Sequence, residues 1–276
     1  MIKKSAGKLR LGIVGCGAIG SRIALSITKE LKNHFMLSAL YDIDSEKAAG
    51  LSRRLKARRG VVKRSVDELI ASCDVVAECV NTPAAQGIIA KAVRARKKVL
   101  VMSVGRLFTR NSLFALARRH GSSLVLPSGA IAGLDAVKAA RLAGFNSITI
   151  TSRKPPAGFQ GNSFLIKKGI HLEDIVSDKL LFEGNVKDAV VKFPQNINVA
   201  AALALAADST RIKVRVIASP SLERNTHEIV CTGKSGTIRT ITENVPCPDN
   251  LKTSYLAVLS GIQALKQLSD QVKIGT

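Results

Sequence analysis

An apolar run followed at once by regularly spaced glycines constrains the fold of this chain more than any other feature. The segment LGIVGCGAIGSR, residues 11–22, places Gly15, Gly17 and Gly20 between a strand-like stretch and a helical pattern. This order is typical of the first strand-to-helix turn of a dinucleotide-binding sheet. Asp42 lies 22 residues beyond Gly20, at the end of the next strand-like stretch, where such sheets carry an acidic group that binds a ribose.

Each glycine has a separate physical role in this interpretation. Gly15 permits a tight turn, Gly17 lets the backbone approach a pyrophosphate, and Gly20 allows close packing of helix on strand. We therefore expect cofactor contacts at Gly15, Gly17, Ala18, Ile19, Gly20 and Asp42. The carboxylate of Asp42 would repel the 2'-phosphate of NADP and therefore favours NAD, although the positive charge of the chain leaves use of NADP open. The alternative is a tight turn with no ligand.

The first half of the chain alternates strand-like and helical stretches. Strands are expected at residues 9–14, 36–41, 61–62, 74–80, 99–102 and 123–126, and helices at 18–31, 45–58, 83–96 and 111–119. This rhythm predicts an α/β domain, a Rossmann-type doubly wound parallel sheet. Loops at the carboxyl ends of its strands then place Val80, Asn81, Ser103 and Gly105 near the nicotinamide half of the cofactor, unless these are ordinary turns.

The second half predicts an α+β domain of mainly antiparallel strands. Strict alternation in RIKVRVIA, residues 211–218, is that of a sheet with one wet face, and similar segments lie at 147–151, 226–232 and 237–243. Helices are expected at 130–143 and 196–207, and a loop at 244–254. We expect residues 1–133 to form the dinucleotide-binding domain, completed by a C-terminal helix within 251–276. Residues 134–250 would form the catalytic, substrate-binding and dimerisation domain.

Composition narrows the classes of protein and leaves one question open. The five cysteines contain no C-x-x-C, so neither a disulfide framework nor a metal site is expected. No apolar stretch is long enough to span a membrane, which favours a cytoplasmic protein. The formal net charge of +22 raises nucleic-acid binding as a rival function. The basic residues are dispersed and only 4% of residues are aromatic, so solvated helix faces are the favoured explanation.

A few polar residues in the second half are candidates for chemistry. Of the four histidines, only His227 lies within a strand-like pattern, on the face of Ile229 and Cys231, where it is either catalytic or a satisfied core residue. Asn196 and Asn198 open an apolar helix, as cofactor ligands or as helix caps. Arg153 and Lys154 end a strand, where they would bind a substrate carboxylate or remain solvated.

Several segments together resemble the L-aspartate dehydrogenase family. They are GCGAIG, VMSVG, PSGAIAGLDA, TSRKPP, FPQNINVAAALALA and NTHEI, in this order, and the resemblance extends from residue 9 to residue 265. It implies NAD(P)-dependent oxidation of L-aspartate to iminoaspartate, which hydrolyses to oxaloacetate and ammonia or feeds NAD biosynthesis. It implies His227 as the active-site residue, cofactor contacts at Ala132 or Ala130 and at Asn198 or Asn196, and a homodimer.

A mechanism follows from that resemblance. The amine of aspartate must be neutral for hydride transfer, so we expect His227 to titrate near neutrality and accept the ammonium proton, or to position the water that attacks the imine. Two other functions remain open at this point. One is a related dehydrogenase for another amino or hydroxy acid, and the other is a non-enzymatic NAD-sensing or nucleic-acid-binding protein.

Overall fold

The computed structural model describes residues 7–80, 82–108, 111–194, 197–248, 250–272 and 274–275. The chain divides into two compact units. The first comprises residues up to 127 together with 261–273, and the second comprises residues 128–260 together with 274–276. Each unit contains its own five-stranded sheet.

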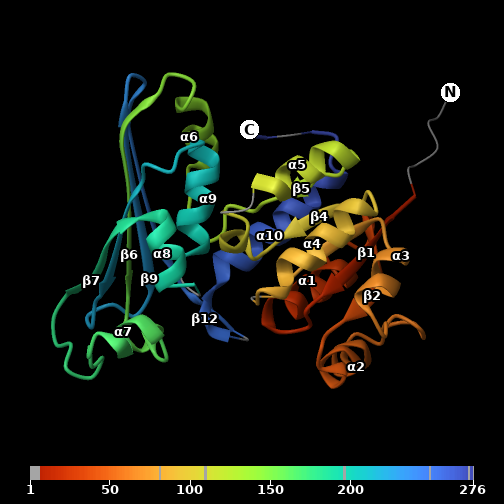
Figure 1. Ribbon diagram of the computed structural model, residues 1–276. Coiled ribbons are helices and arrows are strands. Elements are labelled where there is room, and N and C mark those ends of the chain that lie inside the picture. The colour runs from red at the N-terminus through yellow and green to blue at the C-terminus, as the bar shows by residue number, and fades with distance from the viewer. Residues whose placement is uncertain are drawn as a thin grey trace. The chain divides into compact units, whose positions relative to one another are not determined.

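The first unit is built around a parallel sheet with helices on both faces (Figure 1). Across the sheet, its strands are β2 (Phe35–Tyr41), β1 (Leu9–Val14), β3 (Val75–Glu78), β4 (Lys98–Val101) and β5 (Leu124–Val125). All four residues of β3 are buried, as expected for the central strand of a sheet that is covered twice. The predicted doubly wound parallel sheet is therefore confirmed.

Two apolar clusters hold the helices of the first unit to the two faces of its sheet. The helices are α1 (Ala18–Thr28), α2 (Ser45–Arg54), α3 (Val66–Ala71), α4 (Ala84–Arg94), η1 (Val104–Arg106), α5 (Asn111–His120) and the end of α10 (Tyr255–Ser269). One cluster contains Ile23 of α1, Leu51 of α2 and Leu265 of α10. The other contains Leu69 of α3 and Ile89 of α4. Residues late in the sequence thus complete the core of the first unit.

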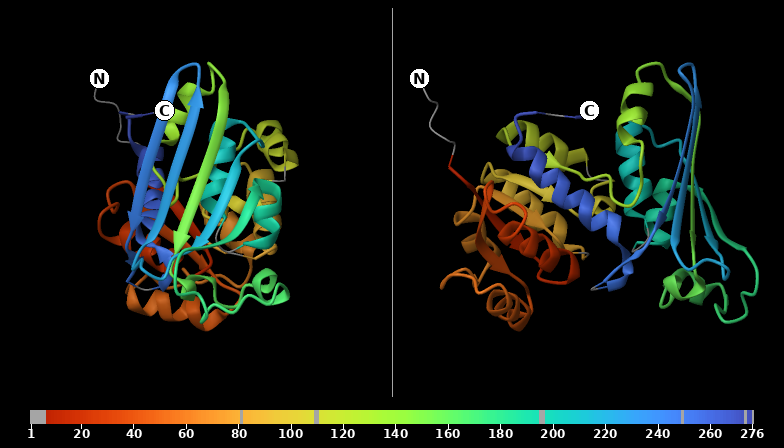
Figure 2. Two further views of the ribbon diagram at one scale, coloured as in Figure 1. Left: turned by 90° about the vertical axis from the view of Figure 1, so that its left-hand side faces the viewer. Right: turned by 180° about the vertical axis from the view of Figure 1, so that it is seen from behind.

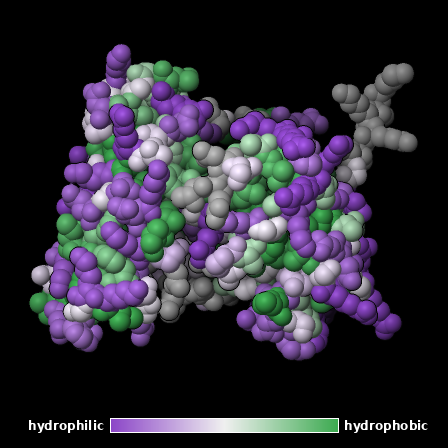
Figure 3. Space-filling view, in the orientation of Figure 1, coloured by the Kyte–Doolittle hydropathy of each residue, from purple (hydrophilic) through white to green (hydrophobic). Residues whose placement is uncertain are grey.

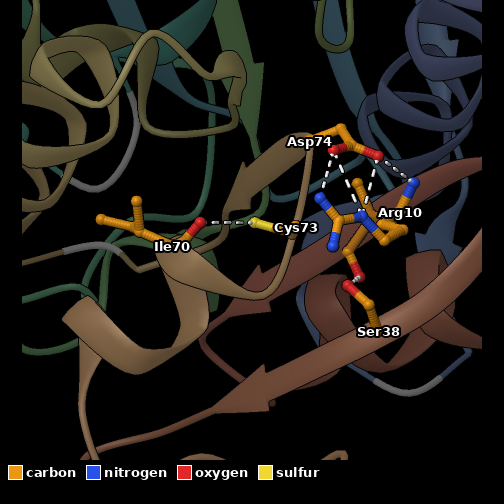
Figure 4. Close-up of polar contacts among 6 residues, drawn as sticks. Arg10, Ser38, Ile70, Cys73 and Asp74 are labelled. Carbon is orange, nitrogen blue, oxygen red and sulfur yellow. Dashed lines mark hydrogen bonds and ion pairs between the residues drawn. The ribbon is translucent and has the colours of Figure 1, made fainter.

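Polar contacts tie β1 to its two neighbouring strands (Figure 4). The guanidinium of Arg10 on β1 donates to the carboxylate of Asp74 before β3, with an Nη2 to Oδ1 distance of 2.7 Å. That carboxylate also accepts from the backbone N–H of Arg10 at 3.0 Å. The hydrogen bond and charge of Arg10 lower the pKa of Asp74. On the neighbouring strand β2, Ser38 donates to the carbonyl of Leu11 at 3.1 Å.

The second unit contains a mixed sheet that is mainly antiparallel. Across the sheet, its strands are β10 (Gly236–Asn244), β9 (Asn225–Gly233), β6 (Phe145–Lys154), β8 (Lys213–Ala218) and β7 (Lys179–Asn185). Only β6 and β8 of these strands pair in parallel. Helices α6 (Leu134–Ala140), α8 (Val186–Lys192) and α9 (Asn198–Ala207) lie on one face, and Figure 2 (left) shows the other face, which no helix of the described chain covers.

The remaining elements of the second unit are short. They are η2 (Pro156–Phe159), α7 (Ser163–Lys167) and a hairpin of β11 (Pro246–Cys247) and β12 (Asn250–Ser254). The helix α9 is apolar on nearly every side and almost wholly buried, as its alanine-rich sequence predicts. It ends at Asp208, which adopts a left-handed conformation with φ of 49°.

Several local expectations prove wrong in detail. Residues 61–62 form only an isolated bridge between Val62 and Leu40. Residues 130–133 precede α6 rather than belonging to it. Gly133 has a left-handed φ of +82°, which is not helical, so the helix begins only at Leu134. The expected loop 244–254 contains the β11–β12 hairpin, so the terminal helix begins at Tyr255 rather than at 251. On that helix Leu259 is 41% exposed, whereas Val258 is buried.

The surface is largely polar on the face seen in Figure 3, with hydrophobic residues scattered among hydrophilic ones. Four of the five cysteines are buried and Cys79 is half-buried, and none of the five forms a disulfide. Among the described residues, no helix combines the length and apolar character that crossing a membrane requires.

Candidate active site

The glycine loop of the first unit has the geometry that a bound pyrophosphate requires. Gly15 has a φ of +94°, and a Cβ there would lie 2.7 Å from the carbonyl oxygen of Cys79. A Cβ at Gly20 would overlap the carbonyl oxygen of Gly15, so helix α1 approaches β1 as closely as predicted. A Cβ at Gly17 would meet nothing within 4 Å. Open space therefore lies beside the start of α1, where Ala18 and Ile19 are half-buried and backbone N–H groups have no partner within the helix.

Asp42 at the end of β2 is held beside the same loop. Its Oδ2 accepts a hydrogen bond from the backbone N–H of Cys16 at 2.6 Å, and its Oδ1 accepts from the backbone N–H of Asp44 at 3.0 Å. Both oxygens are thus fixed in direction, and each keeps a second lone pair for a ligand. The structure brings Asp42 to the glycine loop, as its spacing in the sequence indicates.

A buried carboxylate that we did not predict organises the neighbouring loops at the carboxyl edge of the sheet. Glu78, the last residue of β3, accepts from the backbone N–H of Val80 through Oε1 at 2.8 Å. Its Oε2 accepts from the Ser103 hydroxyl at 2.7 Å and from the Ser103 backbone N–H at 3.2 Å. Burial raises the pKa of Glu78, while these hydrogen bonds lower it. One carboxylate therefore joins the loops that carry the predicted residues Val80, Ser103 and Gly105.

The second unit holds His227 in a buried hydrogen bond. His227 on β9 is 3% exposed, and its Nδ1 lies 2.9 Å from the hydroxyl of Ser152, its partner in register on β6. Burial, and next the charge of Lys154, lower the pKa of His227 from 6.5 to about 3. The expectation that His227 titrates near neutrality is therefore wrong. The imidazole is neutral at physiological pH because its environment excludes the charged form.

The loop with Ala130 and Ala132 is tied to the strand beside His227. Thr242 of β10, the register partner of His227, donates to the carbonyl of Ala130 at 2.7 Å. Asn244 donates to the same carbonyl at 3.1 Å, and Thr240 donates to the carbonyl of Ala132 at 3.3 Å. The predicted cofactor residues Ala130 and Ala132 and the predicted catalytic residue His227 are thus joined through β10.

The start of α9 adjoins the same loop. A Cβ on Gly129 would lie 3.8 Å from the Cγ1 of Val199, the residue after Asn198. Asn198 is half-buried at the first position of α9. Of the remaining predictions, Asn81 and the alternative Asn196 lie outside the described residues.

The two adjacent cations at the end of β6 point to opposite faces of the sheet. Arg153 is 30% exposed, and its guanidinium lies 3.6 Å from Glu228 and 4.0 Å from Asp178. Lys154 is 7% exposed and lies on the helix-covered face with Ser152 and His227. Burial lowers the pKa of Lys154 to about 8. The structure thus separates two residues that the sequence analysis treated alike.

Two missed residues, Glu78 and Ser152, and the burial of Lys154 had signals in the sequence. Glu78 ends an apolar strand, where an acidic residue is buried and has to be hydrogen-bonded. The period-two pattern that buries Ile148 and Ile150 also places Ser152 and Lys154 on the inner face.

Comparison with known proteins identifies relatives of both units. Residues 135–268 match the family model described as aspartate dehydrogenase, C-terminal, and residues 15–127 match that of homoserine dehydrogenase, NAD binding domain. The chain is 43% identical to the L-aspartate dehydrogenase of Methanosarcina mazei, with 97% of this chain and all of the relative covered. It is 42% identical to that of Methanococcus maripaludis strain C7, with the same coverage.

Solved structures show the same fold. The crystal structure of aspartate dehydrogenase from Thermotoga maritima matches 98% of this chain and all of that chain, with a TM-score of 0.74 and 24% identity. A homoserine dehydrogenase from Thiobacillus denitrificans matches 97% of this chain and 76% of that chain, with a TM-score of 0.60 and 13% identity. The full-length identity to the curated relatives goes beyond a shared fold. The chain belongs to the L-aspartate dehydrogenase family.

Proposed function

We propose that this protein oxidises L-aspartate to iminoaspartate with a nicotinamide dinucleotide as coenzyme. Relatives named L-aspartate dehydrogenase match the chain over its full length. The observation that carries the proposal is that one chain combines a glycine loop with open space at Gly17 and a buried Ser152–His227 pair. The first feature suits the coenzyme, and the second suits substrate chemistry.

The residues of the first unit fit the coenzyme. Gly15, Gly17, Ala18, Ile19 and Gly20 would receive its pyrophosphate, and the free lone pairs of Asp42 would accept from the adenosine ribose. Val80, Ser103 and Gly105 are proposed to border the nicotinamide, as Asn81 is. Bound there, the coenzyme supplies a hydride acceptor for the Cα–H of the substrate. The fixed carboxylate of Asp42 disfavours a 2'-phosphate, so NAD is the proposed preference.

The residues of the second unit are proposed to position the reacting groups. Ala130 or Ala132 and Asn198 would present backbone and amide groups to the coenzyme. His227 would act as a neutral hydrogen-bonding group that orients the substrate, because a histidine whose pKa is about 3 rarely carries a proton. Its rotation is fixed by the Ser152 hydroxyl, which can donate to or accept from Nδ1.

A homodimer forms the next part of the proposal. The helix-free face of the second sheet carries Ile241, which is 58% exposed. Around it, Glu228 faces Arg153 at 3.6 Å and Arg239 at 3.9 Å. Such a face, with an exposed aliphatic side chain beside ion pairs, is able to pair with a second copy of itself about a two-fold axis. This surface lies within residues 134–250, the segment proposed from the sequence as the catalytic and dimerisation domain.

The cellular role and location are further parts of the proposal. Iminoaspartate is a precursor of the nicotinate ring in the pathway that the family resemblance implies, so a role in NAD biosynthesis is proposed. The cytoplasm, where the NAD pool and aspartate are both available, is the proposed location.

Steady-state kinetics with NAD and with NADP tests this proposal directly. We expect reduced coenzyme to form with L-aspartate and not with L-glutamate, L-homoserine or L-malate, which form the control panel. His227→Asn is expected to lower kcat by about 10²-fold or more while the dissociation constant of NADH changes less than about threefold. Turnover of another amino or hydroxy acid in preference to aspartate would refute the proposed substrate.

A further inference from the structure

The buried lysine at the end of β6 is the observation that the proposed function leaves unexplained. Lys154 is 7% exposed, whereas Arg153 beside it is 30% exposed and faces Glu228. The Lys154 side chain lies on the inner face of the sheet with Ser152 and His227. On the same face of β6, Ile148 and Ile150 are buried in the core. A buried lysine lowers the stability of the fold relative to an apolar residue at the same position. A chemical role would explain why a lysine is present there.

The neighbouring elements hold the lysine stem in place. A Cβ on Gly158 of η2 would lie 3.5 Å from the Cβ and 3.6 Å from the Cδ of Lys154. The carbonyl of Lys154 accepts from the backbone N–H of Ser219, just beyond β8, at 2.8 Å. The side-chain stem of Lys154 thus lies against η2, and its backbone is held by the residue that follows β8. The folded structure therefore restricts where the Lys154 amine can lie, unlike the amine of an exposed surface lysine.

Lys154 and His227 act electrostatically as a pair. Residue Ser152 pairs with His227, and Lys154 lies two positions further along the same strand, so the two side chains are diagonal neighbours on one face. The charge of Lys154 contributes to the low pKa of His227. Because a second positive charge is disfavoured, the pair holds one proton at most near neutral pH, and that proton belongs to Lys154.

Strand β9 presents His227 to Lys154, and neither η2 (Pro156–Phe159) nor the last three residues of β8 include a titratable residue. Glu228 and Asp178 face Arg153 instead. Burial is the cause that lowers the pKa of Lys154 to about 8, so a substantial fraction of the amine is neutral under physiological conditions.

We propose that Lys154 is the general base of the reaction and that His227 is a positioning residue beside it. This inference rests on the proposed function. The neutral Lys154 Nζ takes one proton from the ammonium group of L-aspartate, which leaves a lone pair on the substrate nitrogen. As the hydride leaves Cα with the pair of electrons of the C–H bond, that lone pair forms the C=N bond. The substrate is oxidised, the coenzyme is reduced, and Lys154 returns its proton to water.

The first test compares Lys154→Met with Lys187→Met, which removes an exposed lysine of α8. We expect Lys154→Met to lower kcat by about 10²–10⁴-fold and to abolish the rise of the pH–rate profile toward alkaline pH near pH 8. Lys187→Met should retain kcat and the pH–rate profile of the wild type within about threefold. Added methylamine or ethylamine should restore turnover to Lys154→Ala, with rates that depend on the amine pKa. Wild-type activity in Lys154→Met, or an unaltered pH profile, would overturn the proposal.

A second measurement separates a base from a carboxylate anchor. Succinate lacks the amino group of aspartate but keeps both carboxylates, so its inhibition constant reports on carboxylate binding alone. We expect Lys154→Met to change that constant less than about threefold. A loss of succinate binding equal to the loss of kcat would identify Lys154 as an anchor and refute its role as base.

A third measurement requires no turnover. The quantity to measure is the difference in unfolding free energy between the wild-type protein and Lys154→Met, from about pH 7 to about pH 10.5. This difference should rise with pH, because the lysine loses its proton at a lower pH in the folded protein than in the unfolded chain. A flat difference would show an ordinary lysine and overturn the proposal, and Lys154→Gln serves if the Met variant fails to fold. If the wild-type protein did not oxidise aspartate but this difference rose, the proposed function would fail instead.

Discussion

The Oδ2 of Asp42 lies 2.6 Å from the backbone nitrogen of Cys16, so the acidic residue at the end of β2 braces the glycine loop that precedes α1. The same carboxylate is thus part of the loop and part of the proposed ribose site. Coenzyme preference and loop geometry are coupled through one side chain.

Replacing Asp42 should therefore change which dinucleotide binds. Asp42→Ala removes the ribose acceptor and the repulsion of a 2'-phosphate, so the affinity for NADH should fall by about 10- to 100-fold while that for NADPH falls less or rises. Asp42→Asn is the matched control, because its amide oxygen still accepts from Cys16. Fluorescence titration with each reduced coenzyme measures both constants. An unchanged NADPH to NADH ratio in both variants would contradict this role.

Local steric demands explain why the first unit was predictable from sequence. Gly15 and Gly20 are required by contacts with backbone a few residues away or on the adjoining strand, and such requirements leave a pattern in the sequence. The strands of the parallel sheet are apolar because they are covered twice. The fold class and the steric roles of Gly15 and Gly20 were therefore predicted correctly.

Features that depend on packing between distant segments were not predictable in the same way. Strand β7 was missed because the irregularity between Leu180 and Phe182 breaks its alternation. The depth of Lys154 depends on η2 as well as on its own strand, and the low pKa of His227 depends on both burial and Lys154. The sequence placed His227 on the inner face but did not show how far its environment excludes a proton.

The loops at the carboxyl edge should loosen when Glu78 is removed. Glu78→Ala leaves the buried N–H group of Ser103 and the half-buried N–H group of Val80 without their acceptor, so the free energy of unfolding should fall by about 2–4 kcal/mol. The dissociation constant of NADH should rise at least threefold, because those loops are proposed to border the nicotinamide. Ser103→Ala, which removes only the hydroxyl contact, should have a smaller effect on both. Denaturant unfolding and NADH titration provide the measurements, and wild-type NADH affinity in folded Glu78→Ala would refute the link.

The open face of the second sheet should govern self-association. Ile241→Glu places a second carboxylate opposite Glu228 on that face, so the proposed dimer should dissociate at least tenfold more readily. Ile166→Glu, at an exposed aliphatic residue of α7, is the matched control and should leave association unchanged. Sedimentation velocity over a range of concentrations distinguishes the species. Equal dimer stability in both variants would place the interface elsewhere.

Acid should destabilise the protein through His227. The folded pKa of about 3 lies below the usual 6.5, so between these values the unfolded chain binds a proton that the folded chain does not. This one group then lowers the free energy of unfolding by up to about 1.4 kcal/mol for each unit that the pH falls below 6.5, and has no such effect above it. His227→Gln should remove one proton from that slope. Urea unfolding at intervals from pH 7 to about pH 5 tests this, and equal slopes for wild type and His227→Gln would mean that the imidazole is accessible to protons in the folded state.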